Sequence, residues 1–292
     1  MHLKTLTTII RNGQMLPYLY LILMFKPFYK LCYLASAKTS GILDLLSQGA
    51  GVPFDELAAG VCSSNEGREA LRAWLQAGIR INVFKLHNNR YTLSWFSRMF
   101  ALPQNDSLVA LAQEVTSLHH QLILKTPDKL KSGSLWGLED QDGELIARSS
   151  RSLEPFQTEA IDLLFPSSGP VRLLEIGCGS AFYIHYAAMN NPLLTAVGIE
   201  LQADVADMAR RNIRGWGLEE RVVIECGDIR NMKPDVPFDI LTLYNNIYYF
   251  PVDTRPDLLK RLRGFIKPGG FLLLTTGCQG GNPGIELLNL WS

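Results

Sequence analysis

The sequence predicts an α/β protein: a mostly parallel sheet in its C-terminal half, behind an N-terminal half that is mostly helical. The length of 292 residues predicts two domains, since a domain usually takes about 100–200 residues. After residue 170, short apolar strands alternate with amphipathic helices, as in a parallel sheet covered on both faces. Before residue 126 the patterns are mainly helical.

The composition is that of a globular chain. Hydrophobic residues make up 47% and charged residues 19%, and 28 basic residues balance 28 acidic ones. Proteins that bind nucleic acids usually carry a concentrated positive field, because neutralising phosphates drives their affinity, and neither half has one. We therefore expect no nucleic-acid partner.

The five cysteines lie at least 30 residues apart, and neither they nor the five histidines form a zinc-ligand spacing. They are Cys32, Cys62, Cys178, Cys226 and Cys278. We expect no disulfide framework and no metal, and a cytoplasmic location, where thiols stay reduced.

The first long segment, residues 15–48, is predicted to be helical and is apolar all round. Its most apolar run, Met15–Phe25, has 11 residues, whereas spanning a bilayer takes about 20. A cleaved signal peptide is the alternative, because Ala35–Ala37 resembles a cleavage site, but two lysines and a proline intervene. We expect no membrane partner and a buried helix or a homodimer interface, because so apolar a segment needs cover.

Next come two shorter helices, 52–59 and 65–78, and then two β-rich runs within 79–93 around a turn-prone His-Asn-Asn. Helices followed by a hairpin are in the order of a winged helix. A DNA-reading winged helix is the alternative, but the would-be recognition helix, 65–78, has no net positive charge. A further helix is predicted over 106–125.

The domain boundaries follow from a change in composition. We expect a helical winged-helix-like domain over 1–125, a polar Gly/Ser-rich linker over 126–153, and an α/β domain over 154–292. The last begins with a helix over 154–165 and continues with five strands, their helices, and a Lys-Pro-Gly-Gly turn at 267–270. The strands are 171–176, 195–199, 222–225, 238–243 and 271–276, and the helices are 180–189, 202–216 and 253–266.

Ligands of such sheets bind at the carboxyl ends of the strands, so the residues after each strand are the candidate site. Gly177 and Gly179 follow the first strand and let a ligand approach the backbone and a helix N-terminus. Glu200 follows the second strand, where a carboxylate can accept hydrogen bonds from a ribose diol. Asp228 follows the third, where it can accept one from an adenine amino group. Together they predict an adenosine site.

The glycine pattern indicates which adenosine compound is bound. The dinucleotide fingerprint needs a small residue at position 182, which is Phe182. Small residues at 177, 179 and 181, with Glu175 before them, resemble motif I of the class I S-adenosylmethionine-dependent methyltransferases. The resemblance continues through Glu200, Asp228 and the Lys-Pro-Gly-Gly turn, over residues 170–280, and implies a Rossmann-like sheet.

That resemblance implies a role for each cofactor-binding residue. Glu175 would organise the glycine loop near the methionine amino group, and the loop residues Gly177, Cys178 and Gly179 would pass under the methionine. Glu200 would hold the ribose and Asp228 the adenine amino group. Leu201 and Ile229 would sandwich the adenine ring, and Tyr244 is a further cofactor-binding candidate.

The N-terminal half is similar to one branch of this family, the small-molecule O-methyltransferases of the plant and polyketide type. The segments that carry the similarity are Phe54–Ala58, Ala77–Ile79 and Asn89–Leu93. In that branch a winged-helix module pairs two subunits and walls the acceptor pocket. The resemblance therefore implies a homodimer that methylates a small, aromatic or natural-product acceptor.

The sequence departs from that branch at the general base. Tyr248 occupies the position of the family's histidine and Tyr244 that of its lysine. An unperturbed tyrosine has a pKa near 10 and is a weak base at neutral pH. Tyr248 is thus a candidate for orienting the acceptor, or a packed aromatic residue, and His120 is a candidate substitute base, or a surface or packing histidine.

We therefore expect S-adenosylmethionine-dependent methyl transfer, with a non-catalytic cofactor-binding scaffold or sensor as the alternative. The sheet of this family normally ends with a further helix and two more strands, whereas only 16 residues follow Thr276. We expect a C-terminally shortened form with an uncovered edge on the side of the fifth strand.

Overall fold

The computed structural model describes residues 3–134, 136–277 and 283–290, and it divides into two compact units, 1–116 and 117–292. The division falls in a π-helical turn, Val115–His119, where one continuous helix was expected over 106–125. Each unit is described by itself. Cys278 lies outside the described residues.

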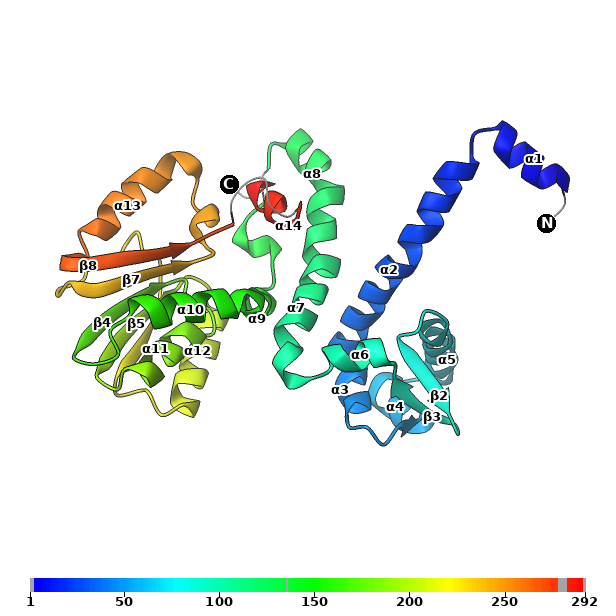
Figure 1. Ribbon diagram of the computed structural model, residues 1–292, viewed down its shortest axis with the longest axis horizontal. Helices are drawn as coiled ribbons and strands as arrows, with labels where there is room; N and C mark the ends of the chain where they lie inside the picture. Colours follow the sequence, from blue (N-terminus) through cyan, green and yellow to red (C-terminus); the bar gives the residue numbers. More distant parts are fainter. Residues whose placement is uncertain (1–2, 135, 278–282, 291–292) are drawn as a thin grey trace. The chain divides into compact units, whose positions relative to one another are not determined.

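The first unit is mainly helical, with one small sheet (Figure 1). Its helices and strands are α1 Leu3–Arg11, α2 Met15–Thr39, α3 Ile42–Ser47, β1 Val52–Pro53, α4 Phe54–Val61, α5 Asn65–Arg80, β2 Phe84–His87, β3 Arg90–Leu93, α6 Trp95–Phe100 and α7 Asp106–Glu114. The strands form an antiparallel sheet in the order β1-β3-β2. The helix, helix, hairpin order predicted over 52–93 is therefore present.

Local sequence explains the boundaries in this unit. Gly41 has φ +75 and separates α2 from α3. The Ser64 hydroxyl accepts a hydrogen bond from the Gly67 amide at 3.1 Å and so caps α5. Gly78, predicted as the end of that helix, instead lies inside it. A Cβ at this position would come within 2.5 Å of the Phe84 ring. Gly78 therefore lets the hairpin pack on α5.

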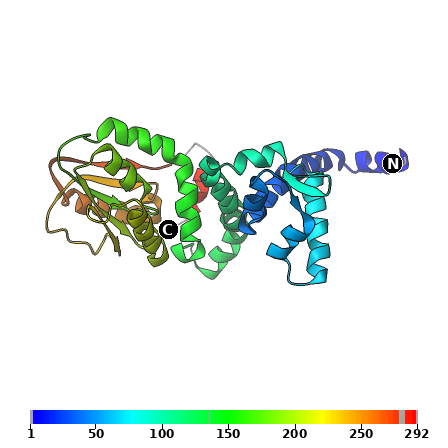
Figure 2. The same ribbon diagram turned by 90° about the horizontal axis from the view of Figure 1, so that it is seen from below.

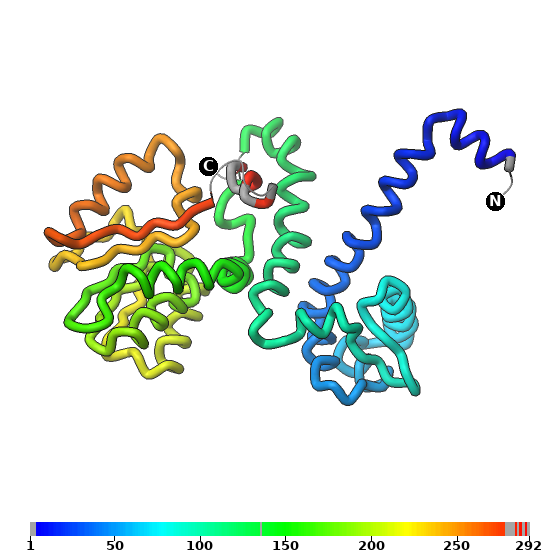
Figure 3. Tube along the Cα trace, in the orientation of Figure 1, coloured from blue at the N-terminus to red at the C-terminus, as the bar shows by residue number. Residues whose placement is uncertain are grey.

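The N-terminal part of α2 carries a row of exposed apolar side chains. Only its last third is buried, at Leu34, Ala35 and Ala37. Figures 2 and 3 show α1 and the start of α2 running away from the cluster formed by α3 to α6. No described helix is both long and apolar enough to cross a membrane.

The second unit is built on a five-stranded parallel sheet in the order β6-β5-β4-β7-β8. The strands are β4 Val171–Ile176, β5 Leu194–Glu200, β6 Val222–Cys226, β7 Phe238–Tyr244 and β8 Ile266–Thr275. Its helices are α8 His120–Ser132, α9 Gly143–Ser149, α10 Glu154–Leu164, α11 Phe182–Asn190, α12 Ala203–Gly215, α13 Arg255–Arg263 and α14 Pro283–Glu286. The predicted α/β fold is confirmed.

Alternate residues of the strands pack into two different cores, which is why the strands are apolar throughout. Leu173 and Ile240 pack with α10, α11 and α12 on one face. Leu174 and Leu241 pack with α13 on the other. Figure 1 shows these helix layers on the two sides of the sheet. Among the described residues β8 is an edge strand of this sheet.

Two sequence expectations differ from the structure. The range 126–153 was expected as a linker, but most of it is helical. Asp142 accepts a hydrogen bond from the Leu145 amide at 3.0 Å at the start of α9. The turn expected at 267–270 lies within β8, where the register with β7 shifts. Gly270 permits this because a Cβ there would meet the Asp239 carbonyl at 2.4 Å.

Candidate active site at the carboxyl ends of β4 to β7

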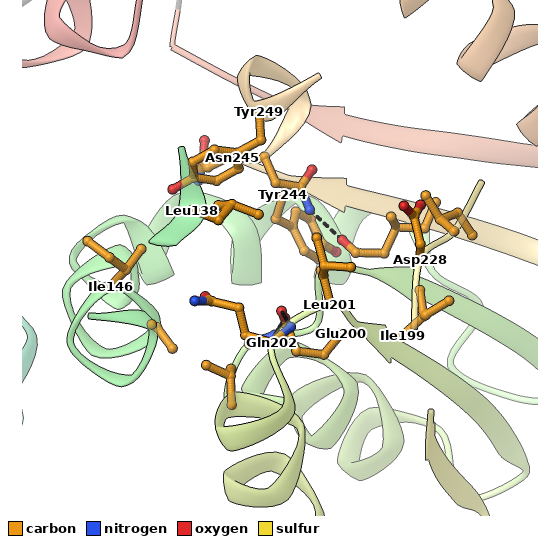
Figure 4. Close-up of a pocket in the computed structure, with 18 of the residues that line it drawn as sticks. Leu138, Ile146, Ile199, Glu200, Leu201, Gln202, Asp228, Tyr244, Asn245 and Tyr249 are labelled. Atoms are coloured by element: carbon orange, nitrogen blue, oxygen red, sulfur yellow. Dashed lines mark hydrogen bonds between the residues drawn. The ribbon is translucent and has the colours of Figure 1, made fainter. Parts of the chain in front are cut away.

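A cavity opens at the carboxyl ends of the parallel strands, where ligands of such sheets bind (Figure 4). Seven predicted cofactor residues line it: Gly177, Gly179, Glu200, Leu201, Asp228, Ile229 and Tyr244. The other two, Glu175 and Cys178, line a smaller adjoining pocket that shares both glycines and Tyr244. The structure thus brings together all nine residues that the sequence predicted.

The glycine loop is held by backbone and side-chain contacts. The Gly177 amide donates to the Ile199 carbonyl at 2.8 Å. Gly177 has φ +65, and a Cβ there would come within 2.3 Å of the Asn246 amide nitrogen. That nitrogen donates to the Ile176 carbonyl at 2.5 Å. Position 177 therefore requires glycine both for its conformation and for this close approach.

Glu200 ties the end of β5 to the loop. Its Oε2 accepts a hydrogen bond from the Gly179 amide at 3.0 Å, and its Oε1 accepts one from the Gln202 amide at 3.2 Å. Figure 4 shows Glu200 beside Leu201 and Gln202 on the wall of the cavity. The Glu200 carboxylate therefore positions the glycine loop. It also lines the cavity, where the ribose diol of an adenosine ligand would lie.

Glu175 is a buried acid at the end of β4. It is 2% exposed, and its Oε2 atom has no hydrogen-bond partner. Burial, and secondarily the charge of Glu200, raises the pKa of this carboxyl group well above its ordinary value. Burial likewise raises the pKa of the Tyr244 hydroxyl nearby. Such an unpaired acid favours a cationic group as its partner.

Asp228 lies two residues after the end of β6, at the start of the following loop, and is bound by Arg230. The Arg230 side chain forms an ion pair with it at 2.6 Å, and the Arg230 backbone amide also donates to Oδ1 at 2.8 Å. These side-chain hydrogen bonds lower the pKa of the Asp228 carboxyl group. Arg230 itself lines the cavity, as a cation that the sequence reasoning did not single out.

The two catalytic candidates are separated by the structure. Tyr248 lines the cavity in a 3-10 turn after β7, with its ring 4.7 Å from that of Tyr249. His120, on α8, is not among the lining residues, and its Nε2 lies 2.7 Å from the side-chain nitrogen of Gln121. The geometry therefore favours Tyr248 over His120 for contact with a ligand.

Sequence reasoning missed the wall formed by α9 and the segment before it. These lining residues are Leu138, Gln141, Gly143, Ile146, Ala147 and Ser150. Gly143 packs tightly on α12, because a Cβ there would come within 2.5 Å of the Gln202 side chain and 2.7 Å of Val205. The Asp142 cap followed by apolar residues was the available signal.

The remaining missed residues follow β7. Asn245 has φ +49 and lines the cavity together with Asn246, Tyr249 and Phe250. The Tyr249 hydroxyl donates to the Gln141 side-chain oxygen at 3.3 Å, which joins this segment to the wall before α9. The described residues contain no group of three or more His, Cys, Asp or Glu able to hold a metal ion.

The segment that forms most of this site is similar to known methyltransferases. The segment 173–270 matches the family model of a methyltransferase domain. It includes the glycine loop, Glu200 and Asp228.

Particular relatives cover parts of the chain. The malonyl-[acyl-carrier protein] O-methyltransferase of Priestia megaterium is 24% identical over 106 residues, which is 36% of each protein. Phosphoethanolamine N-methyltransferase 3 of Arabidopsis thaliana is 30% identical over 122 residues, covering 41% of this chain and 24% of that protein. The chain thus aligns with well under two thirds of the length of these relatives.

Solved structures share the fold over nearly the whole chain. The mitomycin 7-O-methyltransferase MmcR superposes with a TM-score of 0.75 and 18% identity, covering 96% of this chain and 87% of that one. Human N-acetylserotonin methyltransferase, solved with S-adenosylmethionine, gives a TM-score of 0.65 and 17% identity, covering 88% and 79%. The fold of this chain is that of these methyltransferases.

Proposed function

We propose that this protein transfers a methyl group from S-adenosylmethionine to a small-molecule acceptor. The observation that carries the proposal is the convergence on one cavity of the glycine loop, Glu200 and Asp228, from the ends of three adjacent strands. A glycine loop open to a ligand, a carboxylate able to accept hydrogen bonds from a ribose diol and a carboxylate able to accept one from an adenine amino group together match an adenosine compound.

The unpartnered acid beside the cavity distinguishes among adenosine compounds. The buried Oε2 of Glu175 favours a ligand with a cationic amino group, which S-adenosylmethionine has in its methionine part. That compound supplies a methyl group on a sulfonium sulfur. Within this site Glu175 binds the amino group, Gly177 and Gly179 leave room for the methionine chain, and Leu201 and Ile229 flank the adenine.

The acceptor is proposed to lie at the end of the cavity lined by Tyr248, Tyr249 and Ile146. This aromatic and apolar wall suits a small, aromatic or natural-product molecule. Tyr248 is proposed to orient it, because its ring lines the cavity. His120 keeps a role as base only if the acceptor reaches α8. A cytoplasmic location is proposed with this function.

The test of the proposed function is calorimetry on the full chain with S-adenosylhomocysteine, S-adenosylmethionine and NAD. We expect the first two to bind and NAD not to bind. Asp228→Ala should weaken S-adenosylhomocysteine by about 1–3 kcal/mol, the effect of one lost buried hydrogen bond. NAD binding alone, or an affinity unchanged by the substitution, would contradict the proposal.

We also propose that the exposed apolar N-terminal part of α2 pairs two copies of the chain. Its large exposed side chains are Leu16, Tyr18, Leu19, Tyr20, Leu21, Ile22, Leu23, Met24, Phe25, Phe28 and Tyr29. So large an apolar surface is typical of an interface rather than of a free surface.

We expect the wild-type protein to be a dimer by light scattering and Leu19→Lys/Leu23→Lys to be a monomer, because two charges one helical turn apart would be buried in the interface. Leu163→Lys on α10 is the matched control, since Leu163 is 76% exposed in the second unit. A monomeric wild-type protein, or a dimeric double variant, would refute the pairing.

A further inference from the structure

The second acidic residue of the candidate site is already occupied by a residue of its own loop. Both oxygens of Asp228 accept hydrogen bonds from Arg230: Oδ1 from the backbone amide at 2.8 Å and from Nε at 3.0 Å, Oδ2 from Nε at 2.9 Å and from the terminal Nη2 at 2.6 Å. The two residues are two positions apart in the chain.

These contacts leave the carboxylate little capacity for a ligand. An ionised carboxylate has about four lone-pair sites, and three N–H groups of Arg230 point at them, with the single Nε–H shared between the two oxygens. The amino group of an adenine ring needs one of these sites if Asp228 is to bind it. A ligand amino group that binds Asp228 therefore competes with these contacts of Arg230.

Arg230 is free to make this exchange at small cost. Its side chain is 62% exposed, against 18% for Asp228, so the guanidinium can move into water while the acid stays at the cavity wall. Exposed ion pairs are weak, with measured values of about 0.2–1 kcal/mol. The pair is thus strong enough to compete with a ligand and too weak to exclude it.

The same guanidinium offers a ligand a different contact. It carries only hydrogen-bond donors, whereas Asp228 offers only acceptors. A purine with an amino group at C6 matches Asp228, and a purine with a carbonyl oxygen there matches Arg230. We propose that Arg230 is a specificity-determining residue of this site, which competes for Asp228 and so reduces the preference for 6-aminopurine over 6-oxopurine ligands.

This inference rests on the proposed function, because it assumes an adenosyl ligand. The test is calorimetry with S-adenosylhomocysteine and with S-inosylhomocysteine, its analogue with a carbonyl at C6. The proteins are wild type, Arg230→Gln, Asp228→Asn and the double variant, each checked for folding by circular dichroism. Arg214→Gln is the matched control, since Arg214 is an exposed residue of α12 outside the cavity lining.

We expect Arg230→Gln to bind S-adenosylhomocysteine about two- to fivefold more tightly than wild type, the strength of the exposed pair that it removes. It should bind S-inosylhomocysteine no better than wild type, so its preference for the amino compound rises. In the Asp228→Asn background the same substitution should bring no gain, and Arg214→Gln should match wild type. The gain should shrink at 0.5 M salt, which screens exposed pairs.

Each other outcome has a definite meaning. Equal or weaker binding of S-adenosylhomocysteine by Arg230→Gln, or an unchanged preference between the two ligands, overturns the role of Arg230 and leaves the proposed function standing. A gain that persists beside Asp228→Asn also overturns it. Failure of both wild type and Arg230→Gln to bind S-adenosylhomocysteine overturns the proposed function, and this inference with it.

Discussion

Replacing Gly177 by alanine is expected to abolish tight binding of S-adenosylhomocysteine and to destabilise the domain. The new Cβ would come within 2.3 Å of the Asn246 amide nitrogen, so Asn246 must leave the Ile176 carbonyl, which it reaches at 2.5 Å. A lost hydrogen bond with a buried group left unpaired costs about 1–3 kcal/mol. The left-handed backbone at φ +65 costs a further 1–2 kcal/mol, roughly, for a residue other than glycine.

Gly217→Ala separates these two costs. Gly217 has nearly the same backbone angle, φ +66, but a Cβ there would meet nothing within 4 Å, and it lies outside the cavity. Thermal unfolding should therefore show a smaller loss of stability for Gly217→Ala than for Gly177→Ala. Calorimetry should show that Gly217→Ala binds the ligand as wild type does. Adding Asn246→Ala to Gly177→Ala should recover part of the stability. Equal losses at the two glycines would rule out the contact with Asn246.

The parts of the fold that sequence alone predicted are those with a strong local pattern. Four of the five strands of the sheet have the expected positions within a residue, because strands buried on both faces are continuous apolar runs. The fifth, expected over 271–276, begins earlier, at Ile266. The glycine loop, Glu200 and Asp228 were found because parallel topology places strand ends at one edge. Nothing beyond residue spacing was needed to bring them together.

The parts that sequence missed depend on tertiary contacts. The polar stretch 126–153 reads as a linker because its caps and glycines resemble loop residues, yet Gly143 is small in order to pack on α12. The Lys-Pro-Gly-Gly segment reads as a turn, yet Gly270 is needed for close approach to the Asp239 carbonyl within the sheet. In both cases the glycine is needed for packing against another element, which a local pattern does not show.

The hydrogen-bond partners of the site's side chains could not be predicted from the sequence either. Glu200 was predicted to face a ribose, and the structure adds that it holds the Gly179 amide. Asp228 was predicted to face an adenine, and the structure adds Arg230, which is two positions along the chain and is recognised as a partner only from its geometry. A residue type at a strand end indicates a possible contact, whereas the competing contacts depend on rotamers.

The buried acid Glu175 is expected to lower the stability of the ligand-free protein while serving the ligand. Burial, then Glu200, raises its pKa above the ordinary 4.5. A raised carboxyl pKa means that the folded state holds a proton which the unfolded state has lost. The associated stability is therefore fully present below about pH 4.5 and is lost as the pH rises through the folded-state pKa.

Glu175→Gln should therefore raise the melting temperature at pH 7, and the gain should shrink as the pH falls toward 4.5. The gain arises because glutamine, although still polar, has no charge to desolvate in the buried position. Glu200→Gln is the matched control and should lower the melting temperature. The Glu200 carboxylate accepts backbone hydrogen bonds from Gly179 and Gln202, and the substitution removes one of its two acceptor oxygens.

Glu175→Gln should also weaken the binding of S-adenosylhomocysteine at least tenfold, because a hydrogen bond to a charged group contributes about 1.5–3 kcal/mol. Opposite changes in stability and affinity are the signature of an acid kept unpaired for a cationic ligand. If Glu175→Gln lowered the melting temperature at pH 7, the acid would be paired within the fold. If it left the affinity unchanged, the amino group of the ligand would bind elsewhere. Melting curves with and without ligand, from pH 5 to 8, measure both effects on one sample, and their difference isolates the interaction between Glu175 and the ligand.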